Sequence, residues 1–181
     1  WLAAPVTEVF PRVVVGPTAE PRRVRDFALK DVNGNLHTPA EWAGARAVVL
    51  FFLGTECPVS NAYAPEMEAT ARSYGPRKVA FYGVHPDPDV TAEAAARHAG
   101  EYRLSFPILL DAGQVVAGQA GVSVTPEAVV MTPEGYVLYA GRIDDRYSPE
   151  GRRADAARVH DLAAALDAAL ADEMPAATRA E

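Results

Sequence analysis

Two stretches of the chain are hydrophobic at almost every position and lack the alternation of apolar and polar residues that marks a half-buried strand. Residues 46–53 read RAVVLFFL, and residues 78–85 read KVAFYGVH. Unbroken runs of this length are typical of strands that are buried on both faces of a parallel sheet. We therefore expect two buried strands in one sheet that is covered on both faces.

A helical period follows the first run. From about Pro58 to Tyr74 the residues of one face recur every three or four positions, and a proline suits the first position of a helix because its missing N–H needs no partner there. The expected inner face consists of Val59, Tyr63, Met67, Thr70 and Tyr74. Three more helices are expected: one at 88–103, capped by Asp89; one at 113–121, ending in glycine; and one at about 154–171, with Val159, Leu162, Leu166 and Leu170 on one face.

Short extended segments complete the pattern. Asn33-Gly34 is a dipeptide favoured where a hairpin turn needs positive φ, so residues 26–38 are expected to form a hairpin. The other short segments are a helical turn at 39–44, an edge segment at 106–111, and an antiparallel hairpin of 127–132 with 136–142. The order is a βαβ half followed by a ββα half. It predicts an α/β fold with a mixed central sheet and helices on both faces.

The length of 181 residues fits one domain with an extension, and we place that domain at residues 23–172. Residues 1–22 are rich in proline and hold one β-like run at 12–16, and we expect them to lie on the domain as an N-terminal extension. Residues 173–181 are expected to form a flexible tail. The first residues, WLAAPV, are compatible with the remainder of a removed export signal or anchor, which favours an exported protein over a cytoplasmic one.

The charge balance excludes two classes of partner. The net charge is −7, from 24 acidic and 17 basic side chains, and the densest basic groups, at 21–25 and 150–155, are interpreted as solvated faces. Nucleic acids and anionic membrane surfaces both require clustered Lys and Arg, so neither is an expected partner. The longest apolar run, 47–54, is far shorter than the ~20 residues that a membrane helix needs, so no transmembrane segment is expected in this chain.

The chain has one cysteine, and its position favours reactivity. Cys57 lies between the first buried strand and the helix that begins at Pro58, at the end of the sheet where reactive groups of α/β folds gather. The helix N-terminus and a donor from Ser60 stabilise a thiolate, whereas Glu56 opposes it from an exposed position. We expect a moderately lowered pKa for the Cys57 thiol. The alternative, an inert cysteine that packs as a small hydrophobe, fits this position less well.

Two segments carry a family resemblance. LFFLGTECPVSNAYAPEM, at 50–67, and GVSVTPEAVVMTPEGYVLYAGRIDDRY, at 121–147, resemble the thioredoxin-like superfamily in its redoxin branch. That branch groups AhpC/TSA-like proteins, named for alkyl hydroperoxide reductase and thiol-specific antioxidant, with thiol–disulfide oxidoreductase-like proteins. The resemblance covers about residues 24–171 and implies a three-layer thioredoxin-like sandwich.

The resemblance also implies which residues form the site. The family's C-x-x-C unit is matched by residues 57–60 except at the last position, where a serine stands. Thr125-Pro126 takes the place of a cis-proline that packs against the active cysteine and exposes backbone to an extended substrate. The implied catalytic residues are Cys57, Ser60 and Thr55, and the implied substrate-binding residues are Pro58, Thr125, Pro126 and Arg142.

The missing second cysteine leaves three hypotheses about function. In the first, Cys57 exchanges with a disulfide- or sulfenate-bearing protein or a small thiol, and an external thiol reductant resolves the mixed disulfide. In the second, Cys57 reacts with a peroxide. In the third, the domain is a non-catalytic binding module. A resolving cysteine changed to serine would leave the same sequence pattern.

The peroxidase hypothesis is the weaker of the two enzymatic ones. Peroxiredoxins carry P-x-x-x-T-x-x-C, but Gly54 stands three residues before Cys57 and Leu50 stands seven before it. The feature left in favour of a peroxidase is Arg142 or Arg146, either of which could approach the sulfur in the fold. The sequence therefore favours thiol–disulfide exchange.

Other candidate sites are interpreted as structural. HPDPD at 85–89 offers an imidazole and two carboxylates, but its prolines favour an ordinary loop over a metal site. GRIDDRY at 141–147 is interpreted as a solvated turn with local ion pairs, the alternative being a rim near Cys57. His98 and His160 are expected on helix surfaces. No metal and no cofactor are expected.

Overall fold

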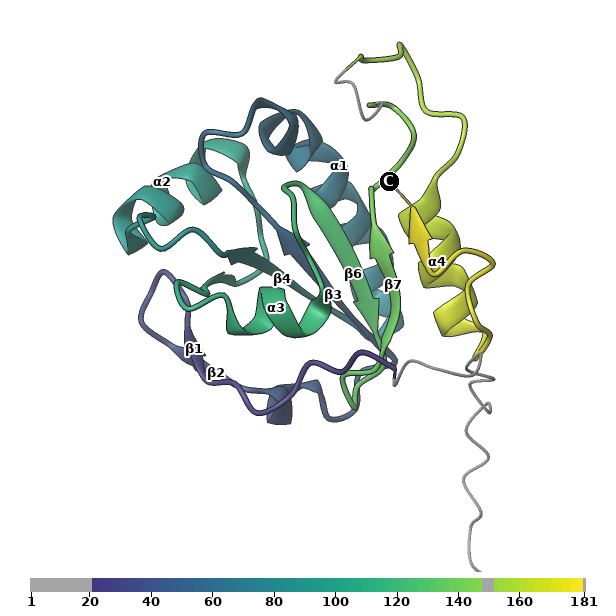
Figure 1. Cartoon of the computed structure of the whole chain (residues 1–181), viewed down its shortest axis with the longest axis horizontal. Helices are drawn as coiled ribbons and strands as arrows, with labels where there is room; N and C mark the ends of the chain where they lie inside the picture. Colours follow the sequence, from purple (N-terminus) through teal and green to yellow (C-terminus); the bar gives the residue numbers. More distant parts are fainter. Residues whose placement is uncertain (1–20, 148–151, 181) are drawn as a thin grey trace, which may run out of the picture.

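A computed structural model of the chain describes residues 21–147 and 152–180. Its main element is a six-stranded mixed sheet in the order β5-β4-β3-β6-β7-β8 (Figure 1). β1 and β2 form a separate two-stranded sheet. The elements have the following bounds: β1 Leu29–Lys30, β2 Leu36–His37, the 3-10 helix η1 Pro39–Trp42, β3 Ala47–Phe52, α1 Pro58–Tyr74, the 3-10 helix η2 Gly75–Arg77, β4 Val79–His85, α2 Ala92–Tyr102, β5 Ile108–Leu110, α3 Val115–Ala120, β6 Glu127–Met131, β7 Val137–Gly141, α4 Asp161–Leu170 and β8 Arg179–Ala180.

The centre of the sheet is β3, and all six of its residues are buried. It pairs in parallel with β4 and antiparallel with β6. Both strands expected from the unbroken hydrophobic runs are confirmed, as is the mixed sheet. The register sets Phe52, the last residue of β3, opposite Glu127, the first residue of β6. The loop that leaves β3 therefore lies beside the loop that enters β6.

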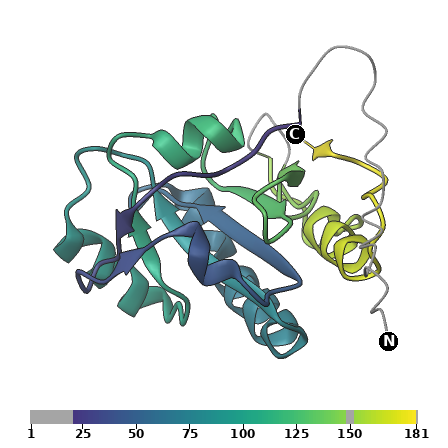
Figure 2. The same cartoon turned by 90° about the horizontal axis from the view of Figure 1, so that it is seen from below.

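Two hydrophobic cores cover the faces of the sheet. Because successive strand residues point to opposite faces, Val49 and Phe51 pack in the core with α1 and α4, while Val48 and Leu50 pack with α3. Figure 2 shows α3 and α1 on opposite sides of the sheet. The expected three-layer sandwich with helices on both faces is thereby confirmed.

The helix that follows Cys57 has the predicted bounds. α1 begins at Pro58 and ends at Tyr74. Within its expected inner face, Tyr63 and Met67 are buried, and Val59 packs against them at the edge of the core. This burial fixes the rotation of α1 about its axis, and so it fixes where the N-terminus of the helix faces.

α2 is shorter than predicted, and its cap is a different residue. The helix begins at Ala92, and the Thr91 hydroxyl caps it by accepting the Ala94 N–H at 3.2 Å. The predicted cap was wrong because Asp89 lies in the preceding turn, where its N–H donates to the Asp87 carboxylate at 2.9 Å.

α4 also begins later than predicted. It starts at Asp161, because the backbone before it bonds to a neighbouring loop instead of to itself: the N–H groups of Arg158 and Val159 donate to the Asp145 carboxylate at 2.7 and 3.0 Å. Val159 is accordingly exposed, not part of the inner face. The other residues expected on that face are buried: Leu162, Leu166 and Leu170.

Across the described residues, no helix combines the length and apolar composition needed to cross a membrane.

The C-terminal end of the described chain forms a short edge strand. Residues 179–180 are not a flexible tail: they form β8, parallel to β7, with Arg142 N–H donating to the Ala180 carbonyl at 3.1 Å. β7 would otherwise present unpaired backbone groups at the sheet edge, and a two-residue strand is too short to show a period in the sequence. Residues 1–20 lie outside the described residues, so the N-terminal extension and its edge strand stay predictions.

Candidate active site around Cys57

Cys57 is the cap residue of α1. Its backbone is extended, and its sulfur accepts the Ser60 N–H at 3.5 Å. The thiol is partly exposed, whereas Glu56 beside it is exposed as expected. The sulfur therefore lies next to the unpaired N–H groups at the N-terminus of the 17-residue helix α1. These groups carry the positive end of the helix dipole and stabilise a negative charge on the sulfur.

Ser60 faces the sulfur from the first turn of α1. Its side chain is almost completely buried, with 1% of its surface exposed, and its hydroxyl accepts the Gly54 N–H at 3.3 Å. The hydroxyl thus links the loop after β3 to the helix. In a C-x-x-C unit the second thiol would stand at this position.

Thr125 reaches Cys57 from the loop that enters β6. The Thr125-Pro126 peptide bond is cis, as the resemblance implied. The Cys57 thiol donates to the Thr125 carbonyl at 3.4 Å. The pairing of β3 with β6 produces this contact, because it places the two loops side by side.

The surroundings of the sulfur lower its pKa. Burial by itself raises the pKa of the Cys57 thiol. The N–H and hydroxyl of Ser60, followed by hydrogen bonds from Val59 and Thr125, outweigh burial and bring the pKa below its ordinary value. The direction agrees with the expectation from the sequence, and the main cause is Ser60.

The loop before Cys57 is held by two histidines that the sequence did not assign to the site. The Asn61 amide donates to the Thr55 carbonyl at 3.3 Å, and the Asn61 carbonyl oxygen lies 2.8 Å from Nε2 of His98. His98 is 5% exposed, so its expected place on a helix surface was wrong. His85 holds the same loop through a 3.1 Å contact between its Nδ1 and the Leu53 carbonyl.

His85 is buried at the end of β4, and burial lowers its pKa to about 4. The rest of the HPDPD segment forms a turn before α2. Within residues 21–147 and 152–180, no three His, Cys, Asp or Glu side chains are grouped so that they could hold a metal ion.

A groove of about 440 Å³ lies beside the Thr125-Pro126 peptide. Its lining combines apolar and charged side chains. The apolar lining includes Val59, Tyr63, Val124, Ile143 and Tyr147, and the charged lining consists of Glu127, Arg142, Asp144 and Arg179. The groove brings together residues that are up to 121 positions apart, from Val59 to Ala180.

The segment GRIDDRY is not a solvated turn. Asp144 is 1% exposed and accepts a hydrogen bond from the Tyr63 hydroxyl, and Arg146 pairs with the same carboxylate at 3.0 Å. Arg142 lines the groove and donates to the Asp161 carboxylate at 2.8 Å. The segment forms one wall of the groove because its acids have partners inside the fold.

Glu127 is the main residue that sequence reasoning missed. It is 2% exposed, lines the groove and follows Pro126 directly. One signal was present, because Glu127 is the only charged residue in the otherwise apolar segment EAVVM. Its partner, Arg179, gave no signal, because it lies in the segment expected to be a tail.

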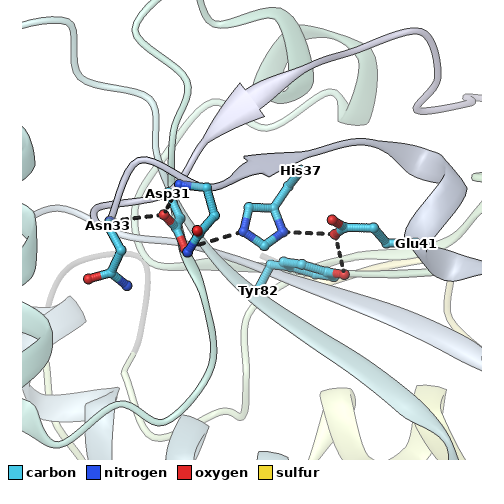
Figure 3. Close-up of polar contacts among 6 residues, drawn as sticks. Asp31, Asn33, His37, Glu41 and Tyr82 are labelled. Carbon is cyan, nitrogen blue, oxygen red and sulfur yellow. Dashed lines mark hydrogen bonds and ion pairs between the residues drawn. The ribbon is translucent and has the colours of Figure 1, made fainter.

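A second polar cluster lies on the β1–β2 hairpin. Figure 3 shows His37 between two carboxylates, with Nε2 3.3 Å from Asp31 and Nδ1 2.7 Å from Glu41, and the Tyr82 hydroxyl donates to Glu41 at 3.3 Å. Burial alone would raise the pKa of Asp31, but hydrogen bonds from the Asn35 side chain, from the backbone N–H groups of Asn35 and Asn33 and from His37 bring it to about 2. The cluster fastens the hairpin to β4.

Comparison with known proteins gives one family. A model of the AhpC/TSA family matches residues 22–140. Among curated proteins, the chain is 30% identical over 114 residues to the thiol-disulfide oxidoreductase ResA of Halalkalibacterium halodurans, which covers 62% of this chain and 62% of the relative. The chain thus spans less than two thirds of that relative's length.

Solved structures agree on the fold. A hypothetical protein from Sinorhizobium meliloti 1021 is 28% identical, covers 91% of this chain and 91% of its own, and superimposes with a TM-score of 0.76. A secreted disulfide oxidoreductase of Mycobacterium tuberculosis is 25% identical over 61% of this chain and 79% of its own, with a TM-score of 0.53.

Proposed function

Because the chain belongs to the AhpC/TSA family, in the redoxin branch of the thioredoxin-like superfamily, we propose that it carries out thiol–disulfide exchange with Cys57 as its one attacking thiol. The relative in Halalkalibacterium halodurans is named a thiol-disulfide oxidoreductase, which supports this class of reaction. The observation that carries the proposal is the position of the sulfur, between the N-terminus of α1 and the Thr125 carbonyl.

The first step is attack on a partner disulfide. The Cys57 thiolate attacks one sulfur of R–S–S–R′, a bond forms between Cys57 and R–S, and R′–S⁻ leaves with the electron pair of the broken bond. Only the thiolate is a good nucleophile, so the lowered pKa of Cys57 increases the reactive fraction at neutral pH.

The second step needs another molecule. Ser60 has no sulfur with which to attack the mixed disulfide, and Cys57 is the only cysteine in the sequence. An external thiolate R″–S⁻ attacks the partner's sulfur, R–S–S–R″ forms, and Cys57 leaves as the thiolate that began the cycle. Cys57 is regenerated, and the external thiol is consumed in the new disulfide.

The surrounding residues have separate roles in this proposal. Ser60 stabilises the thiolate by donating to it, and Pro58 begins the helix whose N-terminus faces the sulfur. Thr125 and Pro126 present backbone beside the sulfur to an extended substrate. Thr55 acts through its carbonyl, which Asn61 holds in place. Arg142 is one of the charged residues that line the groove, which receives the partner.

Three observations favour exchange over peroxide reduction. The residue three before Cys57 is Gly54, which has no hydroxyl for a peroxide. Arg142 is already paired with Asp161, and Arg146 with Asp144. Each arginine would have to leave a carboxylate before it could bind a peroxide at the sulfur.

The rate of alkylation of Cys57 as a function of pH tests the proposal. We expect the midpoint of the profile, measured with iodoacetamide by mass spectrometry, to lie below the ~8.5 of a free thiol. Cys57→Ser controls for labelling elsewhere and is expected to take up no label. A midpoint at or above the free-thiol value would overturn the proposal and favour a non-catalytic binding module.

A further inference from the structure

The C-terminal strand lies on the candidate site. β8 pairs in parallel with β7, and both Arg179 and Ala180 line the groove beside Thr125. Gly141 makes this close approach feasible, since a Cβ at that position would lie 2.2 Å from the Ala180 carbonyl oxygen. The fold therefore brings the end of the described chain against the loop that faces Cys57.

One charged contact connects β8 to that loop. The Arg179 guanidinium lies 3.3 Å from Oε1 of Glu127, whose side chain is only 2% exposed. Oε1 has no hydrogen bond of good geometry, so Arg179 acts on it as a charge. The same guanidinium nitrogen lies 3.5 Å from the Gly121 carbonyl, at the start of the loop.

The other oxygen of Glu127 holds the loop itself. Oε2 accepts the Ser123 N–H at 3.3 Å. Ser123 is two residues before Thr125, whose carbonyl accepts the Cys57 thiol. Contacts therefore run without a break from Arg179 through Glu127 and the loop 121–126 to the sulfur.

Resting on the function proposed above, we infer that Arg179 is a positioning residue for the Cys57 thiol: it neutralises the buried Glu127 carboxylate and so holds Thr125 against the sulfur. The other charged residues of the groove do not replace it. Arg142 is paired with Asp161, and Asp144 is paired with Arg146.

Loss of the Arg179 guanidinium is expected to raise the pKa of the Cys57 thiol in two ways. Glu127 would become a buried carboxylate without a cation, which is strongly unfavourable, and the loop that it holds would open to hydrate it. A carboxylate left charged beside the groove would also disfavour the thiolate. An open loop also withdraws the Thr125 side chain, whose hydrogen bond lowers the pKa of the Cys57 thiol, so this loss and the uncompensated charge both raise that pKa. Loss of the Thr125 carbonyl acts the other way, because the carbonyl accepts only from the protonated thiol, and we expect the two raising effects to dominate.

The test compares alkylation profiles of variants of the 181-residue chain. In Arg179→Met we expect the midpoint to rise by about half a unit to one unit, which lowers the rate at pH 7 by about three- to tenfold. Arg179→Lys, which keeps the charge, and the double variant Arg179→Met with Glu127→Gln, which removes the uncompensated acid, should both return toward the parent profile. Arg77→Met removes an exposed arginine paired with exposed Asp167 and should leave the profile unchanged.

A purely structural role for Arg179 predicts a different result. The melting temperature of Arg179→Met would fall while its alkylation midpoint equalled that of Arg77→Met, and this outcome would overturn the inference. Amide exchange of residues 121–126 tests the positioning separately from the chemistry. Faster exchange in Arg179→Met supports it even if the parent thiol proves unreactive, and unchanged exchange contradicts it.

Discussion

Ser60 is the residue that sets the proposed site apart from the C-x-x-C unit of the family. It takes the place of a second thiol, and its hydroxyl accepts the Gly54 N–H while its N–H and hydroxyl both stabilise the Cys57 sulfur. The site keeps the features that make a thiolate and lacks the sulfur that would resolve a mixed disulfide. At the residue scale, thiol activation and self-resolution are separate properties.

Replacing Ser60 by alanine should reduce thiolate formation. Loss of the hydroxyl removes one donor to the sulfur, and we expect the pKa of Cys57 to rise, with a rate of alkylation at pH 7 about threefold lower for each half unit of the rise. Ser73→Ala removes an exposed serine from the last turn of the same helix and serves as the control. Equal profiles for the two variants would show that the Ser60 hydroxyl does not stabilise the thiolate.

His37 should make the stability of the hairpin depend on pH. Burial alone would lower its pKa, but Glu41 and Asp31 together raise it above the ordinary value of 6.5. A raised pKa in the folded state means that the stabilisation is fully present below pH 6.5 and is lost as the pH rises through the folded value. We therefore expect the difference in free energy of unfolding between the parent and His37→Gln to be larger at about pH 5.5 than at about pH 9.

The control for this measurement is His160→Gln, because His160 is exposed at the start of α4. Its effect on the free energy of unfolding should be small at both pH values. A His37→Gln difference that stayed constant or grew toward alkaline pH would contradict the assignment of His37 as the cation between the two carboxylates.

At the scale of elements, the strands and helices whose residue types are decided by apolar burial could be predicted. The strands β3 and β4 and the helix α1 follow from hydrophobic runs and a periodic inner face, because their burial decides their residue types. The cysteine at the strand–helix junction was found by the same reasoning. Its neighbour in space, Thr125, came from the resemblance and not from any period.

Elements whose positions are decided by a few polar contacts show no hydrophobic period in the sequence. The start of α4 depends on the Asp145 carboxylate, which bonds the N–H groups of residues 158–159. β8 forms because β7 is otherwise an edge strand with unpaired backbone groups, and because Gly141 leaves room for the backbone of Ala180. The wall of the groove that includes Glu127 and Arg179 was missed for this reason, since its parts are distant in sequence and meet only in the folded chain.

Gly141 should be required for the docking of β8. In Gly141→Ala the new Cβ would meet backbone atoms of Ala180, so we expect β8 to separate from β7 and the amide of Arg142 to exchange faster with solvent. The cost in free energy of unfolding should be about 1–3 kcal/mol, the range for inserting an atom into a packed site.

A matched control is Gly100→Ala. Gly100 lies inside α2, and a Cβ there would meet nothing within 4 Å, so this change should stabilise the protein by about 0.5–1 kcal/mol. Unchanged exchange at Arg142 in Gly141→Ala would show that β8 does not depend on the glycine.

At the scale of the whole molecule, the candidate site is assembled from segments that the sheet brings together. The N-terminus of α1 supplies Cys57 and Ser60, the loop before β6 supplies Thr125, and β8 supplies Arg179. The mixed sheet sets their relative positions through the pairing of β3 with β6 and of β7 with β8. The proposed activity therefore depends on the folded domain up to its last described strand.

The most direct measurement of the central claim is the lifetime of a mixed disulfide, followed by intact mass. Reduced protein is mixed with a peptide disulfide, the excess is removed, and the adduct is monitored before and after glutathione is added. We predict an adduct on Cys57 that persists without thiol and disappears with it, whereas Ser60→Cys loses its adduct without added thiol. No adduct on the parent protein, or an adduct that decays equally fast with and without glutathione, would contradict exchange through a single thiol.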